Sequence, residues 1–561
     1  MIGFKDTITT DVLIVGGGIG GLCAAIASAR FGADTLVAEK SDSRRSGSGA
    51  TGNDHFLCYY PKAHGNDIMP ILQETFQSQI GGFHDPKLTL RFLQESIAMA
   101  DRWLEWGINM RPFGPDYEFM GHAFPGRPRI WLKYDGHNQK QILTAQAKKA
   151  GAKILNHTPV VELITADGEI AGALALDVSS EEPAFRLIRA KKVILATGTA
   201  NRLYPAAGTP GSPFNTAFCP ACTGAAQAQA WRVGAKMVNM EMPNRHAGPK
   251  FFARAGKSTW IGVYRYPDGR LLGPFVEQAT RYIGDITCDV WNTAYTDVLR
   301  NGTGPAYIDC TGISQDDLDF MKQGMISEGL TTVVDYMKRS GLDVTKHAFE
   351  FMQYEPHLIG RGLEVDINGE TSIPGLYGTG DMVGNFRSDI SGAAVYGWIC
   401  GNHAASTVQQ GSFREVEHSA WVQERAELYS SLMERKNGGT WKEANLGLQQ
   451  IMASYAAAGP YNVRSENLLK AGLKYLGDLR KESIASVSVR NAHELIRAVE
   501  ALDLMDNGEI IMHAARERKE SRGMHLRSDY TFTNPLLSNK FLQVWQENGT
   551  VHTNWRERWG L

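Results

Sequence analysis

The sequence has few cysteines, and those it has do not form a framework. Its 561 residues include seven cysteines, an odd number that is mostly scattered along the chain. This excludes a disulfide scaffold and suits a reducing compartment, so we expect a cytoplasmic protein, or one held beside a membrane by a partner. An iron–sulfur cluster needs about four clustered thiolates, and only Cys219-Pro-Ala-Cys222 has close spacing. We therefore expect no metal centre in this chain.

The sequence also lacks a long uninterrupted apolar run and an excess of charge of either sign. The apolar stretch from Val12 to Ala29 is interrupted by glycines, and no other stretch is long enough to span a membrane. Met1 to Thr10 has no apolar core, so we expect neither a signal peptide nor a direct membrane span. Lysine and arginine total 58 against 60 acids, a net charge of −2. This balance gives no global field for nucleic acid.

What the chain has instead is a glycine-rich turn near its N-terminus. Val12–Val15 is apolar and predicts a buried parallel strand, and Gly16, Gly18 and Gly21 follow with the spacing G-x-G-x-x-G. The first glycine allows a tight turn, the second lets a pyrophosphate approach the backbone, and the third lets helix and strand pack closely. A helix to Phe31 would direct its N-terminal N–H groups at the phosphates. A bare glycine-rich turn is the alternative explanation.

The residues after this turn favour a dinucleotide cofactor. Thr35–Ala38 predicts a second strand, and Glu39 at its end can accept hydrogen bonds from both ribose hydroxyls. Similar pieces recur downstream: a strand to Gly198, another ending at Asp381, and an apolar helix opening at Ser391. FAD is long and needs contacts along its whole length, so these recurring pieces favour FAD over NAD.

These segments together resemble the succinate dehydrogenase/fumarate reductase flavoproteins, and within them the adenylylsulfate reductase alpha branch. Glu355-Pro-His-Leu-Ile-Gly360 and the arginine-rich run from Arg516 to Tyr530 carry the resemblance most specifically. It implies an α/β fold: a Rossmann-like FAD-binding domain with an inserted α+β capping domain and a C-terminal helical bundle. We expect the FAD-binding domain at 1–239 and 346–411, the capping domain at 240–345, the helical domain at 412–530 and a tail at 531–561.

The resemblance also implies a set of cofactor contacts. The loop from Ser41 to His55 is small, polar and glycine-rich, as in the family's segment along the flavin ring. Gly47 stands where succinate dehydrogenases carry a histidine covalently bound to FAD, so non-covalent FAD is implied. His55 is a poor substitute for that histidine. The expected contacts are Gly16, Gly18, Gly21, Glu39, Lys40, Ser46, Gly47, Thr51, Gly52, Ala196, Thr197, Gly198, Asp381, Ser391 and Gly392.

The catalytic candidates come from two segments that should meet over the flavin. The run Met240–His246 resembles the family's stretch ending in a substrate-binding histidine, and Arg254 and Lys257 fall near its catalytic arginine loop. His357 and Arg361 come from the flavin side. A surface or core role remains the alternative for each of them. Such a cluster of positive charge would attract a small anionic substrate.

One departure from the family bears on the substrate. Fumarate reductases hold a substrate carboxylate with an arginine just before the last helix, and alignment through Gly392 puts Asp389 there. An acid cannot hold a carboxylate at neutral pH, and Arg387 could compensate only through a reshaped loop. Three interpretations stay open. One is an FAD enzyme subunit for a small anion, passing electrons to or from a separate iron–sulfur partner. The others are a dicarboxylate enzyme of the fumarate reductase type and a flavin electron-transfer subunit without its own substrate.

The pair Cys219 and Cys222 precedes a predicted helix that ends at Gly234. A thiol at a helix N-terminus can have a lowered pKa and take part in redox chemistry. A C-x-x-C pair outside a thioredoxin-like context is more often incidental, and the sequence does not decide between the two.

Overall fold

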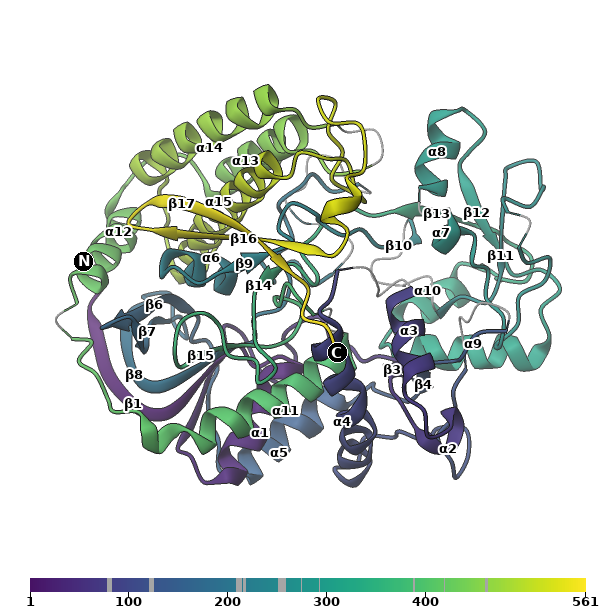
Figure 1. Cartoon of the computed structure of the whole chain (residues 1–561), viewed down its shortest axis with the longest axis horizontal. Helices are drawn as coiled ribbons and strands as arrows, with labels where there is room; N and C mark the ends of the chain where they lie inside the picture. Colours follow the sequence, from purple (N-terminus) through teal and green to yellow (C-terminus); the bar gives the residue numbers. More distant parts are fainter. Residues whose placement is uncertain are drawn as a thin grey trace.

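The computed structural model describes residues 1–77, 83–120, 126–207, 214, 218–250, 259–273, 275–291, 293–386, 389–417, 419–459 and 463–561, without the side chains of 288 and 289. Figure 1 shows a sheet with helices on it at the lower left, a helical layer above it and a separate lobe at the right. No helix in the described residues is long and apolar enough to cross a membrane.

A seven-stranded sheet forms the base of the FAD-binding half, in the order β5-β2-β1-β8-β7-β6 with β15 paired to β8. Strand β1 pairs in parallel with β2 and β8, as the predicted α/β class requires. The strands predicted at Val12–Val15 and Thr35–Ala38 are confirmed as the end of β1 and the whole of β2. The bounds are β1 Phe4–Val15, β2 Thr35–Ala38, β5 Lys153–Leu155, β6 Val160–Ala166, β7 Glu169–Asp177, β8 Ala184–Leu195 and β15 Leu376–Gly378.

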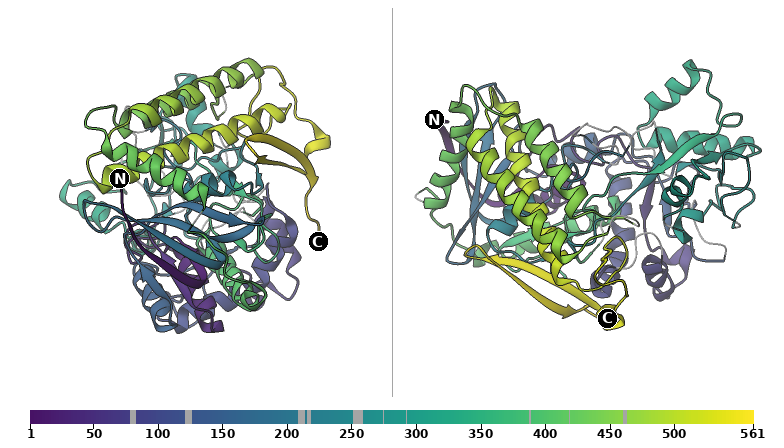
Figure 2. Two further views of the ribbon diagram at one scale, coloured as in Figure 1. Left: turned by 90° about the vertical axis from the view of Figure 1, so that its left-hand side faces the viewer. Right: turned by 90° about the horizontal axis from the view of Figure 1, so that it is seen from above.

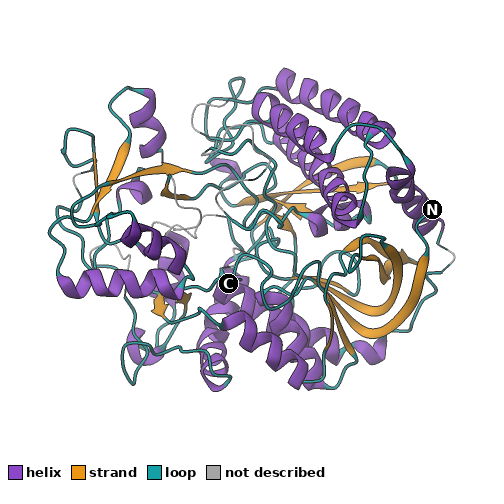
Figure 3. Cartoon of the chain, turned by 180° about the vertical axis from the view of Figure 1, so that it is seen from behind, coloured by secondary structure: helices purple, strands orange, loops and turns teal. Residues whose placement is uncertain are grey.

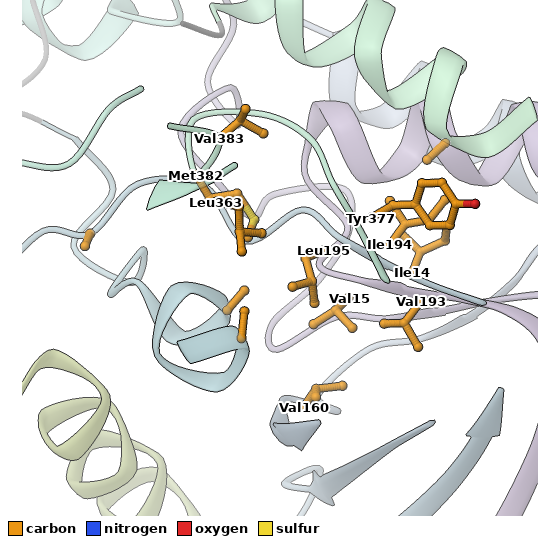
Figure 4. Close-up of a cluster of buried hydrophobic side chains, with 14 of the residues drawn as sticks. Ile14, Val15, Val160, Val193, Ile194, Leu195, Leu363, Tyr377, Met382 and Val383 are labelled. Carbon is orange, nitrogen blue, oxygen red and sulfur yellow. The ribbon is translucent and has the colours of Figure 1, made fainter. Parts of the chain in front are cut away.

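The alternating apolar runs between Val160 and Ala190 predict an antiparallel meander, and strands β6, β7 and β8 confirm it. Asp167 and Gly168 turn the first hairpin with φ of 52° and 78°. Strand β8 is continuous, so its first part pairs with β7 while Val193–Leu195 pairs with β15. Figure 4 shows the buried cluster at these strand ends, where Val15 and Leu195 lie among apolar side chains. The sheet therefore holds the glycine-rich turn after β1 on a rigid apolar base.

Helices α1 (Ile19–Phe31), α5 (Gln139–Lys149) and α11 (Ile390–Ser406) lie together on one face of this sheet, with α4 (Pro86–Glu105) beside α11 (Figure 3). Helices α1 and α11 pack closely because glycines occupy the contact. A Cβ atom on Gly397 would lie 2.2 Å from the Gly20 carbonyl oxygen, and one on Gly401 would lie 2.3 Å from that of Ala24. This contact fixes the start of α11 next to the start of α1.

The lobe at the right of Figure 1 is the capping domain, and it has its own hydrophobic core. Its sheet has the order β10-β13-β12-β11. Because β13 belongs to this sheet and follows residue 345, the sheet extends past the expected end of the domain at that residue. Figure 2 shows the lobe standing apart from the helical layer. The bounds are β10 Ala247–Pro249, β11 Val263–Arg265, β12 Ala306–Asp309, β13 Phe349–Gln353, α7 Thr287–Val290, α8 Ala294–Arg300, α9 Gln315–Ser327 and α10 Thr331–Arg339.

Four long helices form the predicted bundle: α12 Ala420–Glu434, α13 Trp441–Tyr455, α14 Glu466–Ser486 and α15 Ala492–Glu517. The heptad-like apolar spacing predicts the last of these helices over 493–504, but α15 is longer, because polar residues in its second half form hydrogen bonds and ion pairs within the protein. Arg232 at the end of α6 (Ala225–Arg232) forms ion pairs with Asp503 and Asp506, and Asn507 donates to the Gly224 carbonyl. The bundle is thus bonded to the FAD-binding half.

The run Glu547-Asn548-Gly549 predicts a hairpin in the tail, and the structure confirms it as β16 (Lys540–Glu547) and β17 (Thr550–Glu557). Asn548 and Gly549 have φ of 50° and 77°, the left-handed conformations of a tight two-residue turn. The hairpin completes a four-stranded sheet with β9 (Met237–Val238) and β14 (Gly362–Leu363). Beside the capping domain in Figure 1 lie α2 (Pro61–His64), α3 (Met69–Gln77), β3 (His55–Leu57) and β4 (Trp131–Lys133). The apolar periodicity between Pro70 and Trp106 predicts two helices, and these are α3 and α4.

Candidate active site

A cavity of about 390 Å³ lies where the parallel strands end. This is the position at which open α/β sheets bind ligands. Two groups of residues line it. The nucleotide end comes from the β1, β2 and β8 turns and the loop after β2: Gly16, Gly18, Glu39, Lys40, Ser46, Gly47, Ala196, Thr197 and Gly198. The cap end comes from the capping side and the strands below it: His55, Trp131, Lys133, His246, Glu328, Tyr354 and Asp389.

The three motif glycines have different surroundings. Gly16 has φ of 100°, and a Cβ there would lie 2.6 Å from the Ala196 carbonyl oxygen, so only glycine fits. Gly18 caps α1 in an ordinary extended conformation with φ of −71°, and a Cβ would meet only Ala196 O at 3.7 Å. Gly21 does not line the cavity, and its Cβ would lie 1.9 Å from the Gly16 carbonyl oxygen. Gly18 therefore borders the ligand space, while Gly21 serves helix–strand contact.

Glu39 lines the cavity at the end of β2 and is almost fully buried. Its carboxylate accepts hydrogen bonds from the backbone N–H of Gly17 at 2.6 Å and of Ser41 at 2.7 Å. Lys140 of α5 donates to the Gly17 carbonyl, and burial lowers its pKa to about 8, against the opposing effect of Glu39. Each carboxylate oxygen keeps a second acceptor position, so ribose hydroxyls can still bind.

Lys40, next in the chain, lines the cavity with its ammonium group turned toward the helical bundle. It donates to the Ala221 carbonyl at 2.5 Å and to the Glu500 carboxylate of α15 at 2.6 Å. The structure thus couples a predicted cofactor contact to the bundle.

The loop after Lys40 divides into two parts. Ser46 and Gly47 line the cavity, whereas Thr51 and Gly52 do not and approach the capping domain instead. A Cβ on Gly52 would lie 2.2 Å from the Ser327 carbonyl oxygen, and one on Gly329 would lie 2.0 Å from that of Thr51. Of the downstream residues, Asp381 lines the cavity, whereas Ser391 and Gly392 are buried in the first turn of α11 and do not.

The nucleotide end fits FAD. The free N–H groups of the first turn of α1 adjoin Gly18, which leaves room for phosphates without a Cβ in the way. The hydroxyl oxygens of Ser46 and Thr223, both lining the cavity, are buried without a hydrogen-bond partner among the described residues. Buried hydroxyls of this kind are normally satisfied, so a polar ligand accounts for them.

The structure brings two of the catalytic candidates, His246 and His357, together. His246 lines the cavity, and the Phe218 ring lies 5.2 Å from its ring and 4.8 Å from that of His357. The two histidine rings are 6.2 Å apart, but His357 is fully buried and does not itself line the cavity. Their segments are joined because Asn244 and His357 exchange backbone hydrogen bonds of 2.8 and 2.9 Å.

Arg361 does not line the cavity. Its guanidinium donates to the carbonyl oxygens of Met242 at 2.5 Å and Gly360 at 2.6 Å and lies over the Phe83 ring. Its described contacts therefore brace the turn that carries His357. The remaining candidates, Arg254, Lys257 and Arg387, lie outside the described residues.

Several residues of the cap end belong to no sequence motif. Lys133 and Trp131 come from β4, Glu328 from the end of α9, and Tyr354 from just after β13. Each stands in a separate segment without a local motif, so no spacing pattern could have grouped them. The departure from the family at Asp389 is on the cavity wall, where this acid caps α11.

Cys219 and Cys222 both line the cavity. A hydrogen bond with Cys219, together with burial, raises the pKa of Cys222 well above its usual value. A thiol in this state is a poor nucleophile, which favours the incidental interpretation of the pair.

Two models of known protein families match most of this chain. The family model described as an FAD binding domain matches residues 11–394, and the model described as the fumarate reductase flavoprotein C-terminus matches 445–557. A fumarate reductase (CoM/CoB) chain of Methanothermobacter marburgensis is 24% identical, over 95% of this chain and 96% of that protein. L-aspartate oxidase of Vibrio cholerae is 24% identical, over 93% and 95%.

Solved structures agree on the fold. Adenylylsulfate reductase from Archaeoglobus fulgidus superposes with a TM-score of 0.82 at 19% identity, covering 99% of this chain and 96% of that one. Quinol fumarate reductase of E. coli superposes with a TM-score of 0.80 at 20% identity, covering 99% and 97%. With the matched models and the cavity that fits FAD, this chain belongs to the succinate dehydrogenase/fumarate reductase flavoprotein family and is an FAD-dependent oxidoreductase.

Proposed function

We propose that this chain is the flavoprotein subunit of an oxidoreductase that acts on a small anionic substrate and exchanges electrons with a separate iron–sulfur subunit. The observation that carries the proposal is one cavity that has both a nucleotide end and a cap end. A dinucleotide at the first end leaves the second for a substrate under the capping domain. FAD, when bound, supplies the transfer of a hydride, or an adduct at its N5 atom.

The residues of this chain have distinct proposed roles. Gly16, Gly18 and Glu39 would hold the cofactor, with Ser46 and Thr223 as further donors. His246, on the cavity wall, would bind the substrate anion, and Arg254 would add charge from the capping domain. His357 and Arg361 are proposed to position His246. The His357 ring lies beside the His246 ring, and Arg361 braces the turn that carries His357. The close contact of Gly329 with Thr51 would exclude water from the reacting atoms.

Fumarate reduction is the second candidate, and it rests on relatives such as the Methanothermobacter fumarate reductase. Asp389 weighs against it. Its carboxylate is on the cavity wall, where it cannot hold a carboxylate of the substrate as an arginine at that position would. A flavin electron-transfer chain with no substrate of its own is the third candidate, and His246 separates it from the enzyme.

An anaerobic flavin assay tests the proposal. Small anions, including sulfite, succinate and fumarate, are screened for bleaching the oxidised flavin or reoxidising the reduced one. We expect one anion other than succinate or fumarate to react, and H246Q to lose that reaction while keeping FAD. H552Q, in the β16–β17 hairpin, is the control. Vigorous fumarate reduction would instead support the second candidate, and unchanged turnover in H246Q would remove its proposed role.

The iron–sulfur partner is tested separately. The isolated chain should show flavin absorbance without stoichiometric iron or sulfide. When tagged in its native cell, it should co-purify with an iron–sulfur protein that the substrate-reduced flavin reduces. Stoichiometric iron in the isolated chain would contradict the proposal that the iron–sulfur centre lies in a separate subunit.

A further inference from the structure

A buried chain of charged groups ends on the cavity wall at His55. The Asp54 carboxylate is 2.5 Å from Nδ1 of His55 and accepts a hydrogen bond from the Lys133 ammonium at 2.8 Å. Asp54 and Lys133 are almost completely buried, and both Lys133 and His55 line the cavity. Asp54 lies behind them and joins the lysine to the imidazole.

The local structure holds this arrangement rigidly. In the two-stranded sheet of β3 and β4, His55 lies directly opposite Lys133 in the register. The Trp131 ring meets the imidazole edge-on at a centroid distance of 5.1 Å and an angle of 90°. A side chain held by a sheet and an aromatic neighbour keeps one rotamer, which is the condition for aiming a ring nitrogen.

The Asp54 contact determines which nitrogen faces the ligand. Because Nδ1 is bonded to Asp54, Nε2 is the nitrogen left for a group in the cavity, and it has no hydrogen bond to a described residue. This pairing of a carboxylate with one imidazole nitrogen fixes the tautomer and stabilises the imidazolium form.

The capping domain completes the surroundings of the pair. A Cβ on Gly324 of α9 would lie 3.1 Å from an Asp54 oxygen, and the Phe320 ring lies 5.6 Å from the Lys133 ammonium. Glu328 at the end of α9 has a carboxylate oxygen within 4.8 Å of the ligand atoms of Asp54 and His55. Residues of the capping domain therefore form one side of this environment.

Electrostatics favour a histidine that takes up a proton readily. Burial alone would lower the pKa of His55, but the Asp54 carboxylate, with a smaller contribution from Asp389, raises it above its usual value. Lys133 opposes this increase. Glu328 also faces the ring. A divalent cation on these acids is disfavoured, because the Lys133 ammonium already contacts Asp54.

We propose that His55 is a general acid–base residue of the reaction, with Asp54 and Lys133 as its positioning residues. In the oxidative direction the substrate loses a hydride from carbon to FAD and a proton to Nε2 of His55, and the proton then leaves to solvent. The two electrons would leave to the iron–sulfur partner, and the proton that the hydride carried to the flavin would leave to solvent. In the reductive direction each step is reversed. The proposal rests on the proposed function, since it requires FAD and a substrate in the same cavity.

The first test needs no substrate. In FAD-loaded protein labelled with ¹³C-histidine, the H55Q variant identifies the His55 signal by its loss, and a pH titration gives its pKa. We expect a value above that of a free histidine, and a lower value in the double variant D54N/K133Q. The double variant avoids leaving a buried lysine unpaired. An unchanged pKa in the double variant would overturn the role of Asp54.

The second test measures the flavin reaction with whichever carbon-containing anion reacts in the anaerobic screen. A reaction with sulfite alone would overturn the proposed hydride step. Wild-type oxidation should rise with pH through the measured His55 pKa, because the base must be neutral. H55Q should be slower by roughly 100- to 10,000-fold with that pH limb lost, the usual scale for one acid–base group. Imidazole should restore part of the rate in H55A. H552Q is the control, because His552 stacks on Trp545 and lies near the Glu547 carboxylate in the hairpin, away from the cavity.

The outcomes separate this proposal from the proposed function. Reduction of FAD by dithionite should be equal in wild type and H55Q, since it does not use the substrate. If H55Q keeps its rate and pH limb with the reacting anion, His55 is not the acid–base residue although the proposed function stands. If no anion exchanges electrons with the wild-type flavin, the proposed function fails, and this proposal fails with it.

Discussion

At the residue scale, Gly18 and Gly21 belong to one motif but have different roles. Only Gly18 borders the cavity, and its backbone conformation suits any residue. A Cβ added to Gly21 would instead overlap the Gly16 carbonyl oxygen. The motif therefore combines a ligand requirement with a packing requirement, and substitution can separate them.

We predict that G18V folds but does not bind FAD, because the valine methyls would occupy the space beside the first turn of α1. The purified variant should be colourless and should unfold cooperatively, as judged by circular dichroism. G21V should instead be destabilised or insoluble, since its Cβ meets the Gly16 carbonyl oxygen. A G18V protein that purifies fully yellow would mean that the pyrophosphate does not lie there.

Gly47 supports a second residue-scale prediction. It lines the cavity with φ of 81° and has no side chain that could form a bond to the flavin. We therefore expect acid precipitation to release the flavin into the supernatant, where absorbance and mass identify FAD. Flavin that remained with the pelleted protein would point to a covalent link at another residue, of which His55 would be the first to examine.

At the element scale, an ion network joins helix α15 to Lys40, in the loop that follows β2. Glu500 accepts hydrogen bonds from Lys40 at 2.6 Å and from Arg202 and Arg497 at 2.7 Å each. Burial alone would raise the pKa of Glu500, but these three cations lower it to about 2. The network joins the helical bundle, the sheet and the nucleotide end of the cavity.

We predict that E500Q lowers the free energy of unfolding by about 3–5 kcal/mol, because it leaves buried cations without their counterion. Chemical denaturation near pH 7 measures this loss. E494Q, on the same helix in a pair with the exposed Arg490, should cost about 1 kcal/mol or less. Equal effects of the two substitutions would contradict the importance of the network.

The same network gives a pH dependence. The pKa of Glu500 is depressed in the folded state, so its contribution is fully present above the unfolded value of about 4.5. It is lost as pH falls toward 2. The stability difference between wild type and E500Q should therefore shrink in that window, and a difference independent of pH would exclude this origin.

At the scale of the whole molecule, the capping domain meets the FAD-binding half at two glycines, Gly52 and Gly329. Gly329 after α9 has φ of 77° and lies against the Thr51 carbonyl, while Gly312 in the same domain has φ of 80° and open space around it. Alanine at Gly329 or Gly312 is strained by its backbone conformation, but only alanine at Gly329 pushes the two halves apart.

We predict that G329A keeps FAD, turns over more slowly, and lets oxygen reoxidise the reduced flavin faster, because the capping domain no longer excludes solvent. Stopped-flow absorbance of the dithionite-reduced protein mixed with oxygenated buffer measures the last effect. G312A controls for backbone strain alone. If both variants reoxidise at the same rate, the contact with Thr51 does not control closure.

Local patterns in the sequence were enough for the cofactor half. The strand to Val15, the glycine turn, α1 and β2 are governed by contacts between near neighbours, so their spacing alone predicted them. The hairpin at Asn548-Gly549 followed for the same reason, since left-handed turn residues impose it. Helix α15 exceeded its prediction because its polar residues are satisfied by α6, a contact from far along the chain.

The cap end of the cavity depended on the tertiary structure. The sequence pattern grouped His357 and Arg361 as charges over the flavin. In the structure the Arg361 guanidinium instead donates to the carbonyl oxygens of Met242 and Gly360 and does not line the cavity. The sequence pattern gave His55 little weight, yet Lys133, 79 residues from Asp54, completes the buried pair that orients it. The sequence by itself determined the cofactor-binding motif, because short-range geometry specifies it, and the resemblance to the family implied the rest of the fold. Which side chains face the substrate was decided only by folding, because burial and hydrogen bonding between distant segments set their direction.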